Sequence, residues 1–446
     1  MEIIQAYLER KHEELRLLNE CLRSPLLLSP PQSVDEVIKT KFRITAALRA
    51  DHELRDWKAT ETAWSATACP ASGPFRFTYD YQRADLRVVG PSFYQDETGC
   101  TGRAVYTASG MAAISALLLA SAAVIDKADI LVTPGCYGET IELIERLVPH
   151  LRLVTLKGPP CNALARPGSR RILLLDSCVP AGAFEAVLRV DASGLDLLIF
   201  DTTCFAGGSG RIRRVLRWAR RCRIPVVMVR SHTKLDSLGA EYGRLGSAVF
   251  VDPGENGSGS FFEHLARETS DAVRLLGGAA LPAHFPPYVG AAAYWKLTRR
   301  RIAAILRNGR RMSRYFASEL APLSAELHFS HGLYVTLCGR RPLDEASARR
   351  AAEAMSRDLS GEGFPIRHAG SFGFDFAATE WFHHATTDRY SVRVAVPDLP
   401  TELWDGLTAA IARWWGMHQA DLGNGRRGLR RPQAVSPANF DDDSKI

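Results

Sequence analysis

Three short segments of the chain carry side chains that could act together in chemistry. Ser109-Gly110-Met111 precedes an apolar, helical stretch, and a Ser-Gly at a helix N-terminus offers a hydroxyl and free amides to a phosphate. Asp201 ends an apolar run, where a carboxylate is costly to bury without a cation. Lys234 follows another apolar run, and a lysine amine removed from water can become a nucleophile. Phosphate binding, charge pairing and amine chemistry are therefore the functions to consider.

Each segment also has an ordinary explanation. A Ser-Gly is a common helix cap, an Asp at a strand end can cap the next loop, and most lysines lie on the surface. The combination is more specific than its parts, because the phosphate segment, the Asp and the segment Ser231-His232-Thr233-Lys234 follow one another in that order.

This combination resembles the fold type I pyridoxal 5'-phosphate (PLP) enzymes, and most of all their Cys/Met-metabolism branch, which includes cystathionine γ-lyase, cystathionine γ-synthase and methionine γ-lyase. Tyr137-Gly138-Glu139-Thr140 resembles the Tyr-Gly-Gly-Thr of that branch, and Asp201-Thr202-Thr203 its Asp-Asn-Thr. Ser231-His232-Thr233-Lys234 resembles its Ser-Ala-Thr-Lys. Shorter matches are Tyr81-Gln82-Arg83, for a Tyr-x-Arg motif, and the strand-like SVRVAV at residues 391–396. The resemblance covers roughly residues 75 to 420.

The resemblance implies a role for each matched residue. The phosphate of PLP would be held by Ser109, Gly110, Met111, Ser231 and Thr233, together with Tyr81 and Arg83 of the partner subunit. Tyr137 would stack on the ring, and Asp201, followed by Thr203, would pair with the ring nitrogen. Lys234 would form the aldimine, while Arg393 and Ser371 would bind the substrate.

The chain departs from the family pattern at Thr202, which replaces the Asn of Asp-Asn-Thr, in a longer N-terminal helical segment, and in two further motifs. The family has Glu-Ser-Pro-Thr-Asn-Pro before its Asp, whereas this chain has Asp176-Ser177-Cys178-Val179-Pro180 and so lacks the Asn that would bond the phenolic oxygen of the cofactor. The Ser-Leu-Gly-Gly of the family is Ser371-Phe372-Gly373-Phe374 here. These departures bear on the substrate and the reaction more than on the cofactor.

The resemblance implies a lyase or transferase of amino-acid metabolism with biosynthetic relatives. The expected reaction is γ-elimination or γ-replacement on an amino acid, through a Lys234 aldimine and a quinonoid, with Tyr137 as a further acid or base; β-elimination shares the first half of this route. The alternatives are an aminotransferase or decarboxylase on the same fold, and a non-catalytic binding protein that kept the fold. The relatives are homodimers or homotetramers with shared active sites.

The elements around these segments predict an open α/β sheet. Short apolar runs at residues 128–134, 151–156, 171–177, 195–203, 225–231 and 246–252 alternate with helical segments, which is typical of buried parallel strands. We expect the fold of the PLP-dependent transferases (aspartate aminotransferase-like), with a mostly parallel seven-stranded sheet and a smaller C-terminal α+β domain. The expected divisions are a helical and irregular segment (1–75), a PLP-binding α/β domain (76–290), the small domain (291–420) and a disordered tail (421–446).

Composition excludes several classes of protein. The 446 residues carry 56 basic and 49 acidic side chains, a net charge of +7, and the seven arginines of residues 211–223 have an apolar side that favours a solvated helix over a nucleic-acid site. The nine cysteines are scattered without CxxC pairs, so we expect no metal site and a cytoplasmic location. No apolar run is long enough to predict a membrane span.

Overall fold

The computed structural model describes most of the chain. The described residues are 1–57, 71–78, 87–95, 102–156, 169–190, 192, 194–251, 259–320, 325–326, 332–338, 342–384 and 389–422. Tyr81, Arg83 and the tail beyond residue 422 lie outside them.

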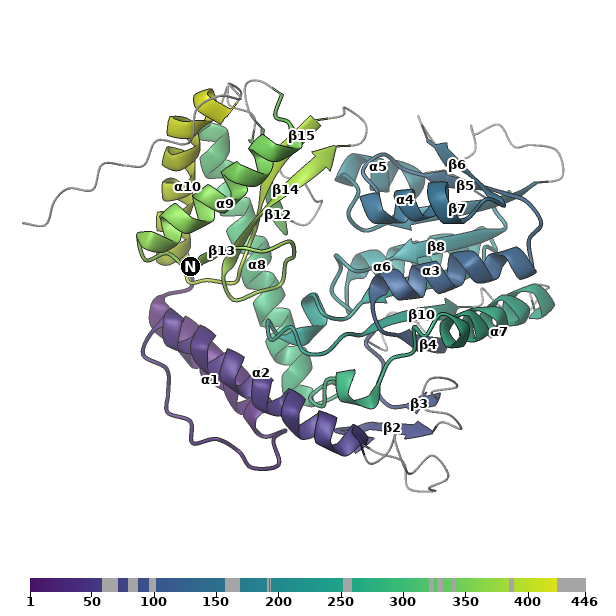
Figure 1. The fold of residues 1–446 in the computed structure, drawn as a ribbon, viewed down its shortest axis with the longest axis horizontal. Helices are drawn as coiled ribbons and strands as arrows, with labels where there is room; N and C mark the ends of the chain where they lie inside the picture. The colour runs from purple at the N-terminus through teal and green to yellow at the C-terminus, as the bar shows by residue number, and fades with distance from the viewer. Residues whose placement is uncertain are drawn as a thin grey trace, which may run out of the picture.

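A seven-stranded sheet forms the centre of the larger part of the molecule (Figure 1). Its order is β4-β10-β9-β8-β7-β5-β6, with β10 antiparallel to both of its neighbours and the other strands parallel. The strands are β4 (Arg103–Thr107), β5 (Ala128–Val132), β6 (Leu151–Thr155), β7 (Arg170–Asp176), β8 (Leu197–Asp201), β9 (Val226–Ser231) and β10 (Gly246–Val251). The six apolar runs predicted as strands are all strands of this sheet, because a strand covered on both faces needs apolar residues on both.

Helices cover both faces of this sheet. One face packs against α3 (Gly110–Ala120), α4 (Gly138–Leu147) and α7 (Gly259–Leu275). The other packs against α5 (Ala181–Val187) and α6 (Gly210–Arg221). The arginine-rich segment is α6, which buries Ile212, Val215, Leu216, Trp218 and Ala219 against the sheet, as its apolar side predicted.

A second sheet forms the C-terminal part, in the order β11-β12-β15-β14-β13. Its strands are β11 (Ala325–Glu326), β12 (Tyr334–Leu337), β13 (Ile366–His368), β14 (Ala377–His384) and β15 (Arg389–Ala395). It shares a core with α8 (Ala292–Glu319), α9 (Glu345–Gly361) and α10 (Thr401–Leu422). The predicted fold class, a mostly parallel seven-stranded sheet with a smaller C-terminal α+β part, is confirmed by this topology.

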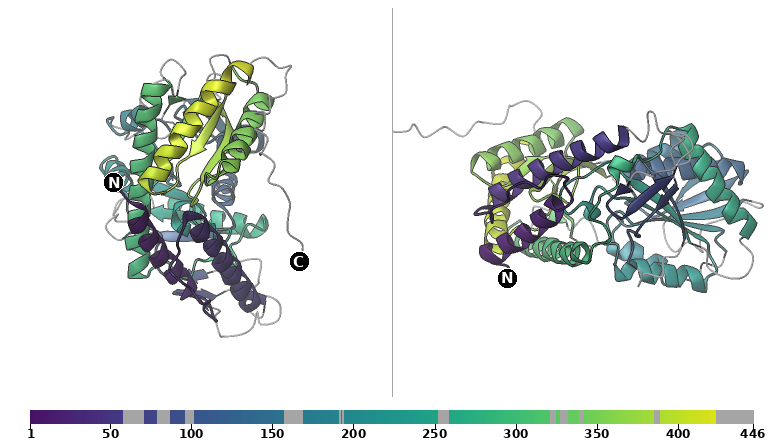
Figure 2. Two further views of the ribbon diagram at one scale, coloured as in Figure 1. Left: turned by 90° about the vertical axis from the view of Figure 1, so that its left-hand side faces the viewer. Right: turned by 90° about the horizontal axis from the view of Figure 1, so that it is seen from below.

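The N-terminal segment consists of two helices that lie side by side, α1 (Ile4–Asn19) and α2 (Val34–Trp57) (Figures 1 and 2). The segment between them contains Ser29-Pro30-Pro31, a sequence that predicts a break between helices. The Gly, Pro and aromatic residues of 61–100 predict irregular structure, but a small antiparallel sheet of β1 (Ala71–Ser72), β2 (Phe75–Thr78) and β3 (Arg87–Val89) lies there. That expectation was wrong because Phe75 and Phe77 alternate with exposed residues and pack against Phe285.

Short one-turn helices connect several elements, at Ser121–Ala123 (η3), Leu235–Ser237 (η5) and Pro282–His284 (η6). Within the residues that the structure describes, no helix combines the length and the apolar character that crossing a bilayer requires. The domain boundaries at residues 75, 290 and 420 stay predictions.

Candidate functional site

The carboxyl ends of three neighbouring parallel strands place the predicted residues at one edge of the large sheet. β7 ends at Asp176, β8 at Asp201 and β9 at Ser231, and Lys234 follows three residues later at the start of η5. Asp176 and Asp201 are paired in register across β7 and β8. Ligands of open α/β sheets bind at this edge, so the topology brings the sequence-predicted residues to a suitable place.

The N-terminus of α3 lies beside the end of β9. Ser109 caps the helix by accepting a hydrogen bond from the amide of Ala112 (3.0 Å), and its side chain is exposed. A Cβ added to Gly110 would come within 2.9 Å of the Cβ of Ser231, so only glycine permits this approach. The amides of Gly110 and Met111 belong to the first turn, where a helix has no acceptors of its own. These groups form a donor-rich surface with the positive end of the helix dipole.

Three hydroxyl groups extend this surface. The Oγ of Ser231 and the Oγ1 of Thr233 share a hydrogen bond of 3.1 Å, and the amide of Ser231 donates to the Oγ1 of Thr203 (3.0 Å). His232, between them in sequence, is buried: its Nδ1 contacts Asp236 (2.8 Å) and its Nε2 contacts Ser247 (2.8 Å). Successive side chains of an extended segment point to opposite sides, and His232 accordingly lies in the core while Ser231 and Thr233 bond to each other.

Asp201 is an acidic group without an ion-pair partner among the described residues. Its Oδ1 accepts a hydrogen bond from the amide of Thr203 (2.8 Å). Burial, and then the neighbouring charge of Asp176, raise the pKa of Asp201 to about 7. The strand end thus holds a carboxyl group whose ionised form would be stabilised by a cation bound next to it.

Asp176 supports Tyr137 from the end of β7. Its carboxylate accepts hydrogen bonds from the amides of Tyr137 (2.8 Å) and Cys178 (2.8 Å), and it is buried. Tyr137 precedes α4, and its side chain is 38% exposed, so it is free to contact a ligand. Burial and the nearby Glu139 raise the pKa of the Tyr137 hydroxyl, which therefore stays protonated near neutral pH.

Lys234 contacts the C-terminal part of the molecule. Its amine donates a hydrogen bond to the Oγ of Ser371 and lies over the ring of Phe372, with the Nζ 5.9 Å from the ring centroid. Burial lowers the pKa of Lys234, which favours the neutral, nucleophilic amine. Two of the predicted residues, Lys234 and Ser371, are thus in direct contact although 137 positions separate them.

The loop that carries Lys234 is fixed by a buried ion pair. Arg230 on β9 forms two hydrogen bonds of 2.7 Å with the carboxylate of Asp236 and donates to the carbonyls of Thr202 (2.7 Å) and Phe205 (2.8 Å). Both side chains are buried. The chain before and after Lys234 is therefore held to β8 and β9.

Arg393 lies on β15 opposite Glu380 on β14. Its Nε donates to the Oε1 of Glu380 (2.7 Å), and its guanidinium lies over the rings of Tyr334 and Phe382, 4.4 Å and 4.3 Å from their centroids. The charges of Arg393 and Glu380 act on both Tyr137 and Lys234, so this pair adjoins the site. Sequence reasoning missed Glu380, because the strand that carries it has no apolar run. The fact that would have identified Glu380 is its pairing with Arg393 on the neighbouring strand, which the sequence does not reveal.

The described residues fit the chemistry of PLP. Ser109, Gly110, Met111, Ser231 and Thr233 offer donors to a phosphate. Asp201 has no ion-pair partner among the described residues, and a pyridinium nitrogen could supply the missing cation. The amine of Lys234 is partly buried. Three buried or partly buried thiols, Cys136, Cys178 and Cys204, surround Asp176, and burial raises the pKa of each, so they pack as neutral groups. No cluster of metal-binding side chains occurs among the residues with described positions.

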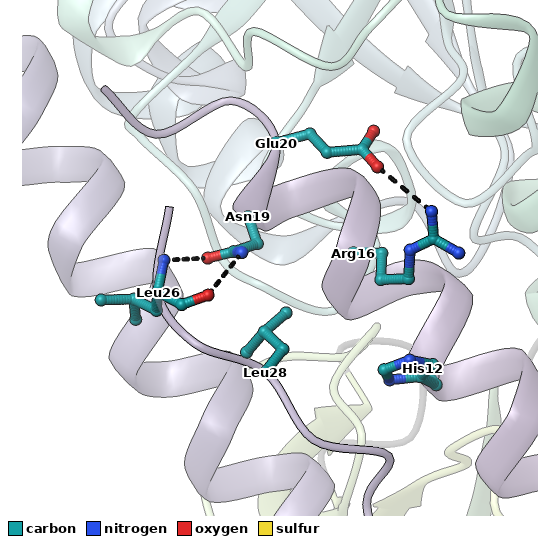
Figure 3. Close-up of a pocket in the computed structure, with 6 residues that line it drawn as sticks. All are labelled: His12, Arg16, Asn19, Glu20, Leu26 and Leu28. Atoms are coloured by element: carbon teal, nitrogen blue, oxygen red, sulfur yellow. Dashed lines mark hydrogen bonds and ion pairs between the residues drawn. The ribbon is translucent and has the colours of Figure 1, made fainter. Parts of the chain in front are cut away.

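A groove of about 350 Å³ elsewhere on the surface is not part of this site (Figure 3). It lies along α1 and is lined by His12, Arg16, Asn19, Glu20, Leu26 and Leu28. Asn19 is bonded to the backbone of Leu26, and Arg16 pairs with Glu20 at 3.6 Å. Its polar groups are thus largely used within the chain.

Comparison with known proteins leaves the family unassigned. No family model matches the chain, and no curated protein does. A solved structure with a similar arrangement is that of metB from Corynebacterium glutamicum, with 15% identity and a TM-score of 0.49 over 72% of this chain and 82% of that one. A similarity of this size assigns neither family nor activity, so the argument for function rests on the site itself.

Proposed function

We propose that this protein is a PLP-dependent enzyme that carries out elimination or replacement at the γ carbon of an amino acid, with elimination at the β carbon as the closely related outcome. The observation that carries the proposal is the grouping at one sheet edge of Asp201, the partly buried Lys234 amine and the donor-rich N-terminus of α3. An acid without a cation, a nucleophilic amine and a phosphate site are the three groups that PLP requires.

PLP, when bound, supplies a ring that accepts negative charge from the α carbon of an amino acid. Asp201 would keep a proton on the ring nitrogen, since its carboxylate gains an opposite charge there. Tyr137 would cover one face of the ring. Ser109, Ser231, Thr233 and the first amides of α3 would hold the phosphate, with Thr203 fixing the position of Ser231.

Lys234 would move protons at the substrate. Its lowered pKa leaves the amine able to take a proton from the α carbon and to return it at a neighbouring carbon. Ser371, which accepts a hydrogen bond from that amine, would orient it. The Tyr137 hydroxyl, protonated because its pKa is raised, would donate a proton to the departing group.

Arg393 would bind the substrate carboxylate. Its Nε is already bonded to Glu380, and two aromatic rings flank its plane, so the guanidinium is held in one orientation. Tyr81 and Arg83, which lie outside the described residues, would complete the phosphate site of a second subunit in a homodimer or homotetramer. The amino-acid chemistry suits a cytoplasmic enzyme.

The proposal is tested with an amino acid that carries a γ leaving group, by measuring the released group and the keto acid together. Wild-type protein with PLP should release both, and Lys234→Ala should bind PLP without turnover. Normal turnover by Lys234→Ala would contradict the assignment. Release of a keto acid without the leaving group would instead indicate transamination.

A further inference from the structure

Each of three helices contributes side chains to two different hydrophobic cores. Each also carries buried charged residues at the positions between those two sets of side chains. α1 contributes Tyr7 and Leu8 to the core of the C-terminal sheet, and Leu15 and Leu18 to a second core that also contains Leu238 and Tyr242. α2 does the same with Val37 and Ile38 on one side and Ile44 and Leu48 on the other. α8 contributes Ile305 and Met312 to the core of the C-terminal sheet, and Tyr294 and Leu297 to the second core. The crossing points are Arg10, Lys11 and Glu14 on α1, Lys41 on α2 and Arg301 on α8.

These charges form one buried cluster, which we call the crossing cluster. It consists of Arg10, Lys11, Lys41 and Arg301 with Glu14, Asp375 and Asp398, all buried, and Glu2 completes it at the rim. Lys41 lies 2.6 Å from Glu14 and 2.6 Å from Asp375, and Lys11 lies 2.8 Å from Asp375 and 2.7 Å from Asp398. Arg301 pairs with Asp375 and with Asp398. Burial alone would raise the pKa of Asp375, but Arg301, Lys11 and Lys41 hold it well below its usual range.

The cluster also donates hydrogen bonds to the backbone of two loops of the site, the loop after Lys234 and the loop after Ser371. Lys41 donates to the carbonyl of Leu238 (2.8 Å), in the loop after Lys234. Arg301 donates to the carbonyl of Gly373 (2.8 Å), in the loop after Ser371. These loops touch directly, because a Cβ added to Gly373 would come within 2.7 Å of the carbonyl oxygen of Lys234. The same two loops also meet where the amine of Lys234 donates a hydrogen bond to the Oγ of Ser371.

We infer that the crossing cluster is a positioning device for the catalytic lysine, and that Lys41 is its key residue because it joins the N-terminal helices to both site loops. Lys234 comes from the large sheet, whereas Ser371 and Arg393 come from the C-terminal part. Because the cluster bonds both loops to the same three helices, it holds Lys234 and Ser371 in fixed relative positions before substrate binds. This inference rests on the proposed function only in naming Lys234 as the reactive amine.

A balanced pair of substitutions isolates the positioning role. Lys41→Met alone would leave an uncompensated carboxylate and destabilise the fold. Lys41→Met combined with Glu14→Gln removes one charge of each sign, so the cluster stays balanced. The remaining three cations and three anions are Arg10, Lys11, Arg301, Glu2, Asp375 and Asp398. The bond to the Leu238 carbonyl is lost in this variant. Lys39→Met is the matched control, since Lys39 lies on the same helix and pairs with Asp35 at the surface.

The test is hydrogen exchange of the cofactor-free proteins, followed by PLP binding. In the balanced double variant we expect amides of residues 235–240 and 371–375 to exchange at least about tenfold faster, while β7 and β8 are unchanged and Lys39→Met behaves as wild type. PLP affinity of the double variant should fall by about tenfold. Unchanged loop exchange, or faster exchange throughout the molecule, would overturn the inference. Loop-specific exchange in a protein whose wild type never binds PLP would uphold the inference and contradict the proposed function.

Discussion

At the scale of single residues, Asp201 combines a functional requirement with a cost to stability. In the cofactor-free protein its pKa is raised to about 7, whereas an unfolded Asp ionises near 4. The folded state therefore keeps a proton that the unfolded state has lost across this range, and stability contributed by Asp201 falls as the pH rises from about 4 to about 7. An ionised Asp201 gains a partner only when a cation binds.

Asp201→Asn should make the cofactor-free protein more stable at pH 8 by about 1–3 kcal/mol, because it removes an unpaired buried charge. The difference should vanish near pH 4, where the wild-type carboxyl is protonated. The same variant should lose at least about tenfold in PLP affinity, since no anion remains for the ring nitrogen. Thermal unfolding at the two pH values and equilibrium dialysis measure these effects. Asp35→Asn, at an exposed ion pair, is the control; parallel pH profiles for Asp201→Asn and wild type would refute this account of Asp201.

Glu380 is a residue whose role depends on orientation and not on contact with substrate. Glu380→Gln keeps the shape of the side chain but removes the charge that holds the Nε of Arg393. We expect KM for the amino acid to rise by about tenfold while kcat changes less, because the proposal has Arg393 binding the carboxylate in both the ground state and the transition state. Glu345→Gln breaks a comparable but exposed pair with Arg349 and should leave both constants unchanged. An unaltered KM in Glu380→Gln would remove Arg393 from the substrate site.

At the scale of elements, the N-terminus of α3 has two functions that can be separated. Ser109→Ala removes the helix cap and should cost about 1 kcal/mol of stability. Asp344→Ala removes the cap of α9, where the carboxylate accepts a hydrogen bond from the amide of Ser347, and should cost a similar amount. PLP affinity should fall by about tenfold only in Ser109→Ala, because of the two caps only Ser109 belongs to the proposed phosphate site. Thermal unfolding and PLP titration of both variants make the comparison; an equal affinity in the two would reduce Ser109 to a structural cap.

Sequence patterns predicted the strands that are continuous apolar runs and missed strands whose apolar pattern is interrupted by exposed or polar residues. β7, β8 and β9 are continuous apolar runs, and the predicted site residues Asp201 and Lys234 lie at or after the ends of β8 and β9. β4 was missed because it lies at the sheet edge with exposed residues at its start. β14 was missed because Thr379 and Glu380 interrupt its apolar pattern. Polar residues in a strand that borders a site obscure the periodicity on which such predictions depend.

At the scale of the whole molecule, the crossing cluster could not be predicted from the sequence. Its members lie on α1, α2 and α8 and in the segments before β14 and after β15, so that Arg10 and Asp398, 388 positions apart, are 2.6 Å apart in space. In the sequence these residues look like ordinary surface charges of amphipathic helices. Their burial follows only from the packing of helices between two cores.

The proposed sharing of sites between subunits gives a prediction for mixtures. Arg83→Ala and Lys234→Ala should each be inactive alone, Arg83→Ala because the partner's phosphate site loses a cation. Mixed and allowed to exchange subunits, they should regain about a quarter of wild-type turnover, since each hybrid dimer holds one intact site. Activity assays after mixing, with sedimentation to verify the oligomer, make the test. No recovery in verified hybrids would contradict shared sites.

The measurement that tests the central claim most directly is the visible absorption spectrum of the protein after PLP is added and unbound PLP is removed. The account predicts a retained band that borohydride bleaches, with the reduced label found on Lys234 by peptide mapping. Lys234→Ala should retain PLP without covalent attachment. A protein that stays colourless, or one whose label maps to other lysines, would contradict the assignment of this sheet edge as a PLP site.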